Sequence, residues 1–245
     1  MAKVLSEVRS LVRSFLDETT AADWSNAELN SLINTKYHEV RTMVVTTFED
    51  YYMTTDLFDT IANRQEYTSA HGVPTDVFKI RRVELNYDTG ATSGAPTRML
   101  PIHNFDAVRR DLALTNSGIG LKTNGNSLYY SYGFRSNFTI GFIPIPTNSD
   151  TDAVKIWYIQ EATDLSSDSS DVNIPYADKN YIHIVYGATA DALRFGGQAT
   201  SEAERFESLY KAGLDKMQEE LEERDAQDTK TVLDFSGDSL DFSSV

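Results

Sequence analysis

The chain has 245 residues, of which 40% are hydrophobic, and this is enough for one full core or for a core with a smaller satellite domain. Cysteine is absent, which excludes disulfides and thiolate metal sites and allows a reducing compartment. The net charge of −15, from 22 basic and 37 acidic residues, disfavours tight binding to duplex DNA.

The sequence also argues against a membrane or secretory destination. No apolar run approaches the roughly 18 residues that a membrane span requires. Glu7 and Arg9 stand where a signal peptide would need its apolar stretch. We therefore expect neither a membrane span nor secretion.

Two amphipathic helices are predicted at the N-terminal end. Residues 3–18 place apolar side chains on one face at helical spacing, with Arg9, Arg13 and Asp17 elsewhere on the surface. The second helix, over residues 25–52, begins where Ser25 and Glu28 have the spacing of a capping box. The β-branched residues between positions 42 and 47 weaken its far end and favour a kink or an early stop there.

The middle of the chain reads as short strands. Residues 58–61 and 64–67 are expected to pair around Ala62 and Asn63. Residues 77–87 form a longer strand, and its apolar side chains change from even to odd positions, which predicts a bulge near Arg81 and Arg82.

The remaining elements of this middle region follow the same signals. We expect a turn-rich tip over residues 88–97 and a short helix over 105–114. Residues 128–134 and 138–143 predict a hairpin, and residues 154–159 predict the last strand.

The C-terminal end returns to helices. An acidic, serine-rich connector over residues 164–173 leads to helices over 175–196 and 200–227. The first of these is rich in small residues, so another helix can approach it closely. The tail then repeats itself, because Leu233-Asp234-Phe235-Ser236 recurs seven residues later as Leu240-Asp241-Phe242-Ser243.

The predicted fold class is α+β. Helices from opposite ends of a chain can bury their apolar stripes only against each other, so the termini should form one helical bundle. This bundle carries a central antiparallel β insertion and an extended acidic C-terminal tail. The predicted divisions are residues 1–55 and 164–227 for the bundle, 56–163 for the insertion and 228–245 for the tail.

No constellation of catalytic residues accompanies this layout. None of the four histidines has i,i+4 spacing on a helix, and Gly118 and Gly120 lack the third glycine of a dinucleotide loop. The aspartates of the connector (Asp164, Asp168 and Asp171) match no EF-hand spacing, and we favour a solvated linker over a calcium site. We predict no catalytic, cofactor or metal site, and therefore no enzyme.

Two features leave alternatives open. The tyrosines Tyr129, Tyr130 and Tyr132 could stack on nucleic-acid bases, but without basic residues between them a half-buried sheet face is the better interpretation. The tail is either an end without function or a segment that orders against a partner. The candidate anchors for binding such a partner are Leu233, Phe235, Leu240 and Phe242.

The succession of segments resembles a known family. DWSNAELNSLINTKYHEV is followed by VPTDVFKIRRVEL, FIPIPTNSD, VKIWYIQEATDL and VNIPYADKNYIHIVYGATADAL. This order resembles the head-to-tail adaptor proteins of tailed bacteriophages, also called head-completion or tail-tubular-A-like proteins, over about residues 3–215. The order is more telling than any single segment. The acidic repeat of the tail is not a pattern that we can match to the family.

The resemblance implies a virion structural protein of the neck, assembled in the host cytoplasm. Such adaptors combine a helical bundle with a β region and form a ring, usually twelve-fold, between the portal protein and a tail or nozzle protein. Their C-terminal segment commonly docks onto the portal, and DNA passes through the ring without specific binding. The alternatives are a tail or neck ring component below the adaptor, or a carbohydrate-active hydrolase with a carboxylate pair among its acids.

Overall fold

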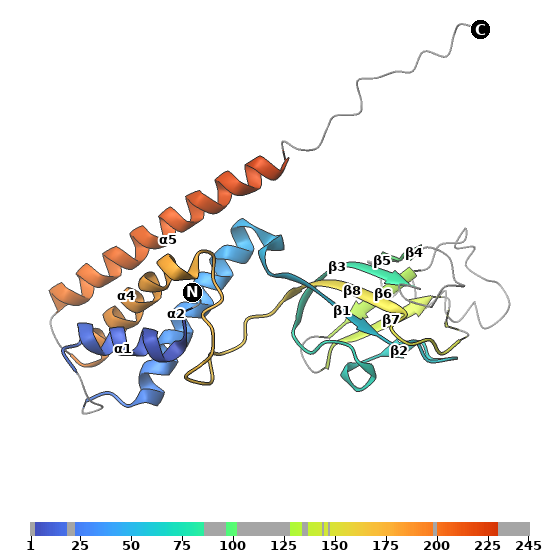
Figure 1. The fold of residues 1–245 in the computed structure, drawn as a ribbon, viewed down its shortest axis with the longest axis horizontal. Helices are drawn as coiled ribbons and strands as arrows, with labels where there is room; N and C mark the ends of the chain where they lie inside the picture. Colours follow the sequence, from blue (N-terminus) through green and yellow to red (C-terminus); the bar gives the residue numbers. More distant parts are fainter. Residues whose placement is uncertain are drawn as a thin grey trace, which may run out of the picture. The chain divides into compact units, whose positions relative to one another are not determined.

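The computed structural model of the chain describes residues 3–18, 23–85, 97–101, 128–133, 137–143, 145–146, 148–197 and 200–229. The chain divides into two compact units, which we call the helical unit (residues 1–49 and 164–245) and the β unit (residues 50–163). The fold is mixed α+β, as predicted, with helices from both ends of the chain and strands from its middle (Figure 1). The predicted domain limits at residues 55, 163 and 227 stay predictions.

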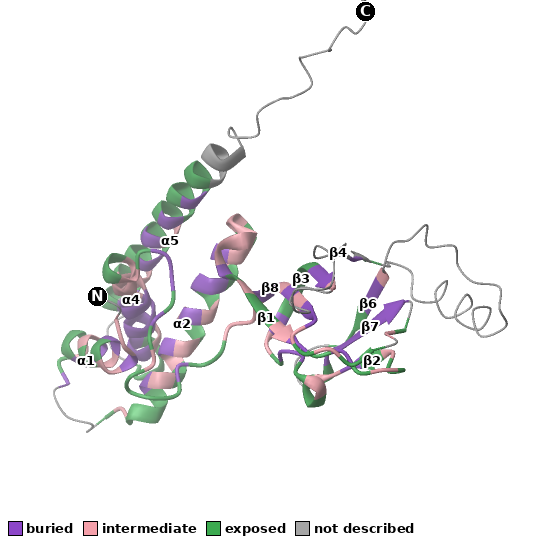
Figure 2. Cartoon of the chain, turned by 45° about the vertical axis from the view of Figure 1, so that its right-hand side comes forward, coloured by how far each residue is buried: buried purple, intermediate pink, exposed green. Residues whose placement is uncertain are grey.

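The helical unit is a bundle built around one central helix. Its elements are α1 (Leu5–Phe15), α2 (Asn26–Thr47), α4 (Ala177–Phe195) and α5 (Thr200–Thr229). α4 packs against each of the other three helices, and its buried faces are visible in Figure 2. The small residues predicted to permit close approach are buried in it, namely Gly187, Ala188, Ala190 and Ala192. The bundle of N-terminal and C-terminal helices is therefore confirmed.

α2 begins as predicted but ends early. The Ser25 hydroxyl accepts the Glu28 amide at 3.2 Å, and a Glu28 carboxylate oxygen accepts the Ser25 amide at 2.8 Å. The helix ends at Thr47, which confirms the early stop expected from the β-branched residues and shortens the span predicted over residues 25–52. A short 3-10 turn, η1 (Glu49–Tyr52), follows. The side chains of Thr42, Thr46 and Thr47 bond to carbonyls four residues earlier, a pattern that weakens a helix.

A buried polar cluster joins the end of α1 to the start of α2. The Arg13 guanidinium donates to Glu18 at 3.0 Å, to the Trp24 carbonyl at 2.9 Å and to Asn26 at 2.8 Å. Glu18 in turn accepts the amides of Asp23 and Trp24 at 2.7 and 3.0 Å. The prediction that Arg13 lies on the surface is therefore wrong. Helical periodicity could not reveal a charge that is buried by partners beyond its own helix.

The described residues of the β unit form two four-stranded sheets. The first has the order β1 (Met53–Phe58), β8 (Val154–Gln160), β3 (Val77–Leu85) and β4 (Thr97–Arg98), and all of its pairs are antiparallel. The second has the order β2 (Glu66–Tyr67), β7 (Thr139–Ile143), β6 (Leu128–Tyr132) and β5 (Leu100–Pro101), and only the β5–β6 pair is parallel. Both sheets contribute to one core, which includes Phe58, Tyr67, Val83, Ile140, Phe142 and Ile156.

The predicted pairing of residues 58–61 with 64–67 is wrong. β1 instead pairs with β8, and β2 pairs with β7. The hydroxyl of buried Tyr67 accepts the Ile61 amide at 3.0 Å and lies 3.2 Å from the carbonyl oxygens of Ile61 and Arg64. The intervening segment therefore folds around this hydroxyl as a loop and does not form a ladder.

Other predictions in the middle of the chain are confirmed. The register of β3 against β8 shifts between Ile80 and Arg82, at the predicted bulge. β6 and β7 pair antiparallel as the predicted hairpin strands, and β8 is the predicted last strand. Most of the predicted tip at 88–97, the short helix at 105–114 and the tail from residue 230 lie outside the described residues.

Removing a buried side chain from the bundle should destabilise the helical unit. Leu29 on α2 is 0% exposed, whereas Leu209 on α5 is 39% exposed. We expect Leu29→Ala to lower the free energy of unfolding by about 2–5 kcal/mol and Leu209→Ala to change it by less than about 0.5 kcal/mol. Denaturant unfolding followed by the helical circular dichroism signal measures both. Equal effects of the two substitutions would contradict the assignment of Leu29 to the core.

Candidate interaction surfaces

The described histidines and acids do not converge on a reaction centre. His38 lies 2.6 Å from Asp164, Asp168 pairs with Arg9 at 2.8 Å, and Asp171 makes a backbone bridge to Val4. The connector aspartates therefore face different partners. Within the described ranges, no group of three or more histidines and acids could hold a metal ion.

The tyrosines of β6 serve the second sheet. Tyr129 lies in the core shared by the two sheets, whereas Tyr130 is buried in a separate cluster with Ile143. The rings of Tyr130 and Tyr132 stack with centroids 6.4 Å apart. Their hydroxyls donate to the two carboxylate oxygens of Glu66 at 3.0 and 3.1 Å. Burial raises the pKa of both hydroxyls, and the charge of Glu66 raises it further. A carboxylate between the rings repels phosphates, so this arrangement suits β2–β6 attachment better than base stacking.

A second polar cluster fixes α5 against α2 and α4. The Lys36 ammonium donates to Glu39 at 3.1 Å and pairs with Asp191 at 3.0 Å, and the Tyr210 hydroxyl donates to Glu39 at 2.8 Å. Burial alone lowers the pKa of Lys36, but the bonds to Asp191 and Glu39 outweigh it and raise the pKa. This cluster therefore holds α5 in a fixed position against α2 and α4.

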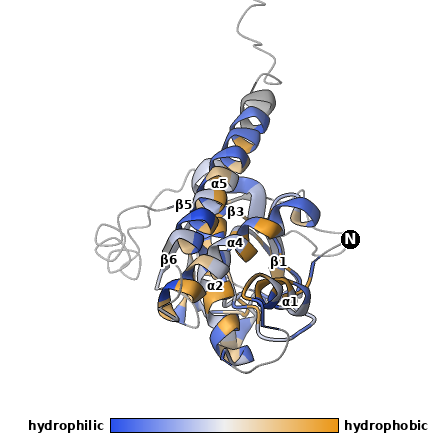
Figure 3. Ribbon diagram, turned by 90° about the vertical axis from the view of Figure 1, so that its left-hand side faces the viewer, coloured by the Kyte–Doolittle hydropathy of each residue, from blue (hydrophilic) through white to orange (hydrophobic). Residues whose placement is uncertain are grey.

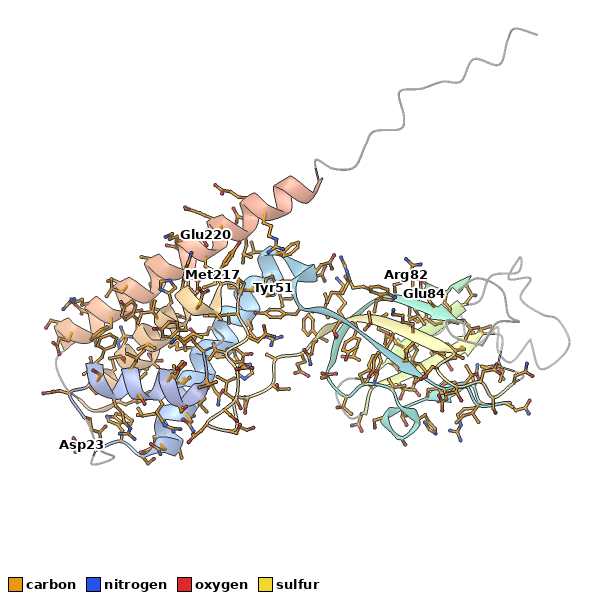
Figure 4. The ribbon with its side chains drawn as sticks, in the orientation of Figure 1. Asp23, Tyr51, Arg82, Glu84, Met217 and Glu220 are labelled. Atoms are coloured by element: carbon orange, nitrogen blue, oxygen red, sulfur yellow. The ribbon has the colours of Figure 1, made fainter. Side chains whose placement is uncertain are left out.

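The first turns of α4 and the second half of α5 line a cavity of about 790 Å³, which we call the α4–α5 groove. Its wall carries three cationic side chains and two carboxylates (Lys179, Lys216, Arg224, Glu220 and Glu223), together with Tyr176, Ile182 and His183. Figure 4 shows the stretch of α5 concerned, where Met217 is buried in the bundle and Glu220 is exposed.

His183 forms part of the groove wall by packing against α5. A Cβ on Gly213 would lie 2.0 Å from the His183 Nδ1 atom, so only glycine permits this approach. Burial lowers the pKa of His183 and Lys216 lowers it further, whereas Glu220 acts in the opposite direction. The imidazole is therefore biased toward its neutral form, and the fixed charges of the groove come from the lysines, the arginine and the two glutamates.

The far end of α5 concentrates negative charge. Four exposed glutamates occupy it, namely Glu219, Glu220, Glu222 and Glu223. Figure 3 shows the hydrophilic surface of this helix. By sequence, the helical unit holds 25 acidic and 12 basic residues, net −13, whereas the β unit holds 12 acidic and 10 basic residues, net −2. Four exposed carboxylates so close together make this part of α5 favour a cationic partner.

Sequence reasoning missed the α4–α5 groove and the role of Glu66. Lys179 and His183 are four residues apart on α4, as are Lys216 and Glu220 on α5, and this spacing places each pair on one helix face. That signal was present, but nothing local indicated that the two faces meet. The predicted anchors Leu233, Phe235, Leu240 and Phe242 lie outside the described residues.

Comparison with known proteins adds one match. A family model described as SU10 adaptor protein matches residues 5–232, a range that includes all of the helices and strands that the structure describes. No curated protein matches the chain. Among the described helices, none has the length and apolar character needed to cross a membrane.

Adding a methyl group to Gly141 should loosen the second sheet. A Cβ there would lie 2.2 Å from Tyr130 Cζ, so Gly141→Ala forces the ring away from Glu66. We expect a loss of about 1–3 kcal/mol in unfolding free energy, measured by denaturant titration. The cost should disappear in a Tyr130→Ala background. Gly196→Ala is the control, because its Cβ would lie no closer than 3.4 Å to a neighbouring atom.

Proposed function

Because the chain belongs to the SU10 adaptor protein family, we propose that it forms the ring that joins the portal of a tailed bacteriophage to its tail. The family membership identifies a phage adaptor, a structural component of the virion. The observation that carries the proposal is the extent of the match, which begins in α1 and runs through α5. The proposed role is assembly, without catalysis.

The proposed ring consists of copies of this chain, twelve by resemblance to the adaptors of tailed phages. Two large apolar side chains support self-association, because they are mostly exposed in the single chain. Phe78 on β3 is 61% exposed, and Phe195 at the end of α4 is 75% exposed. Burial of such side chains against a neighbouring subunit is favourable.

We assign portal binding to the C-terminal tail. The family match ends at residue 232, immediately before the first copy of the Leu-Asp-Phe-Ser repeat. The repeat therefore belongs to this chain beyond the matched region, as expected for a segment that recognises one particular partner. Its four apolar side chains are Leu233, Phe235, Leu240 and Phe242.

The acidic charge supports passage of DNA through the ring. Affinity for DNA comes largely from lysine and arginine that neutralise phosphates, and each subunit instead brings a net charge of −15. Screening limits the effect to groups within about 8 Å of the duplex at physiological salt, so only side chains that line the channel contribute. The exposed glutamates of α5 are candidates for that lining.

The proposal predicts that electron microscopy of the protein mixed with its portal protein shows a ring attached to the portal. Replacing Leu233, Phe235, Leu240 and Phe242 together by alanine should weaken portal binding roughly a hundredfold or more, because each buried side chain contributes about 1.5–3 kcal/mol. A pull-down or biolayer titration measures the affinity.

The matched control replaces serines of the same tail, Ser236, Ser239 and Ser243, by alanine and should bind the portal as the unaltered protein does. Thermal unfolding should be the same for all of these proteins. Unchanged portal binding by the fourfold alanine variant would show that the tail does not hold the portal. Absence of rings on the portal would refute the adaptor assignment itself.

We also predict no measurable affinity of the isolated protein for duplex DNA near physiological salt. The reason is that neither unit carries a net positive charge that could attract phosphates, since the helical unit has a net charge of −13 and the β unit −2. Fluorescence anisotropy of a labelled duplex is the measurement. Micromolar or tighter binding would overturn the interpretation of the ring as a passive conduit.

A further inference from the structure

Most basic side chains of the helical unit are paired. Among the described residues of this unit, four basic side chains form neither a hydrogen bond nor an ion pair with another described residue: Lys179, Arg205, Lys216 and Arg224. Arg224 lies over the ring of Phe48, at 5.9 Å from its centroid. Three of the four, Lys179, Lys216 and Arg224, line the α4–α5 groove. In a unit of net charge −13, two lysines without a carboxylate partner in one cavity indicate a site for an external carboxylate.

The charge balance of the groove limits how many carboxylates it can accept. Lys179, Lys216 and Arg224 face Glu220 and Glu223, so the groove carries one excess positive charge while His183 is neutral. One additional carboxylate balances it. The groove also offers apolar surface, because Tyr176 is 52% exposed and Ile182 is half-buried beside it. An acidic segment with flanking apolar side chains fits both properties.

The chain itself contains such a segment at a suitable distance. Residues 230–245 follow α5 directly and carry Asp234, Asp238 and Asp241 against one lysine. Glu220 lies about 14 Å before the end of α5 at about 1.5 Å per residue. An extended chain reaches about 17 Å to Asp234 but about 40 Å to Asp241. Only the second copy of the repeat can comfortably turn back to the groove.

We propose that residues 240–243 dock in the α4–α5 groove of their own chain before assembly. The Asp241 carboxylate lies between the ammonium groups of Lys179 and Lys216. Leu240 and Phe242 pack against Tyr176 and Ile182. Gly237, between the two copies of the repeat, permits the reversal of the chain.

Docking has a consequence for assembly that rests on the proposed portal-binding role of the tail. In the docked state, Leu240 and Phe242 are covered, and only Leu233 and Phe235 remain accessible to a partner. The free protein then binds the portal more weakly than an undocked tail would, since part of the tail must first leave the groove. The portal therefore competes with the groove for the second copy of the repeat. Free subunits consequently bind other partners of the tail with reduced affinity.

The experiment uses the full chain and its lack of cysteine. Ser244→Cys introduces a single thiol for a nitroxide spin label. We expect the label to broaden the amide NMR signals of residues 176–183 and 216–224 in dilute protein. Lys216→Glu should abolish the broadening by placing a third carboxylate at the site, and Lys179→Glu should do the same independently.

The control is Arg205→Glu, which makes the same change from a positive to a negative side chain on α5 but outside the groove. This variant should retain the broadening. Thermal unfolding checks that each variant is folded. Absence of broadening at the groove, or its persistence in both lysine variants, overturns the proposal. A second experiment mixes isotope-labelled chains without a spin label with spin-labelled chains that carry no isotope. Broadening of the isotope-labelled signals in this mixture would also overturn the proposal, because the tail would then dock on a second copy.

Portal binding is measured separately on the unlabelled variants. Lys216→Glu should bind the portal several-fold more tightly, since its tail is released. If Lys216→Glu abolishes docking but portal affinity is unchanged, docking stands and the portal-binding role of the tail fails. If docking is absent while the fourfold alanine variant still loses the portal, the proposed function stands and the docking fails.

Discussion

The helical unit depends on the close approach of three helices at Gly187. A Cβ at this position would lie 2.9 Å from Lys36 Cδ and 3.1 Å from Tyr210 Cδ2, so α2 and α5 both reach α4 only because a side chain is missing. Lys36 crosses this gap to Asp191, and its ammonium lies 5.2 Å from the centre of the Tyr210 ring. Burial and the charge of Glu39 raise the pKa of Tyr210, so its hydroxyl remains protonated and donates to Glu39. The two ends of the chain are therefore joined by packing and by a saturated polar cluster at one place.

Local signals were sufficient to find the elements but not their partners. The capping box at Ser25 and the glycines after Phe195 act over a few residues, so the sequence alone locates these helix ends. β1 pairs with a strand about a hundred residues later, and β2 pairs with β7. Neither pairing can be predicted from the alternation of apolar and polar residues along a strand. That alternation shows which face of the strand is buried, but not which strand lies beside it. The burial of Arg13 could not be predicted for the same reason, since its partners Glu18, Trp24 and Asn26 all lie beyond its own helix.

The candidate sites divide in the same way. The family was recognisable because the order of several weak segments survives along the whole chain, and the match over residues 5–232 confirms it. The anchors Leu233 and Phe235 were visible as a repeat, and their role stays a prediction. The α4–α5 groove was not visible, because it exists only where Lys179 on α4 comes near Lys216 on α5. The relevant information is the pairing of two helices, which periodicity does not encode.

The β unit leaves and rejoins the helical sequence through paired strands. Met53 in β1 lies opposite Ile159 in β8, so the first and last strands of the unit are neighbours in one sheet. A disordered insertion of this length would oppose formation of the bundle through loop-closure entropy. A unit that folds first shortens the effective loop to a few residues and reduces that entropic cost by about 2–3 kcal/mol. Folding of the β unit before the bundle is thereby favoured, because it lowers the entropic cost of bringing together the helices that precede and follow it in the sequence.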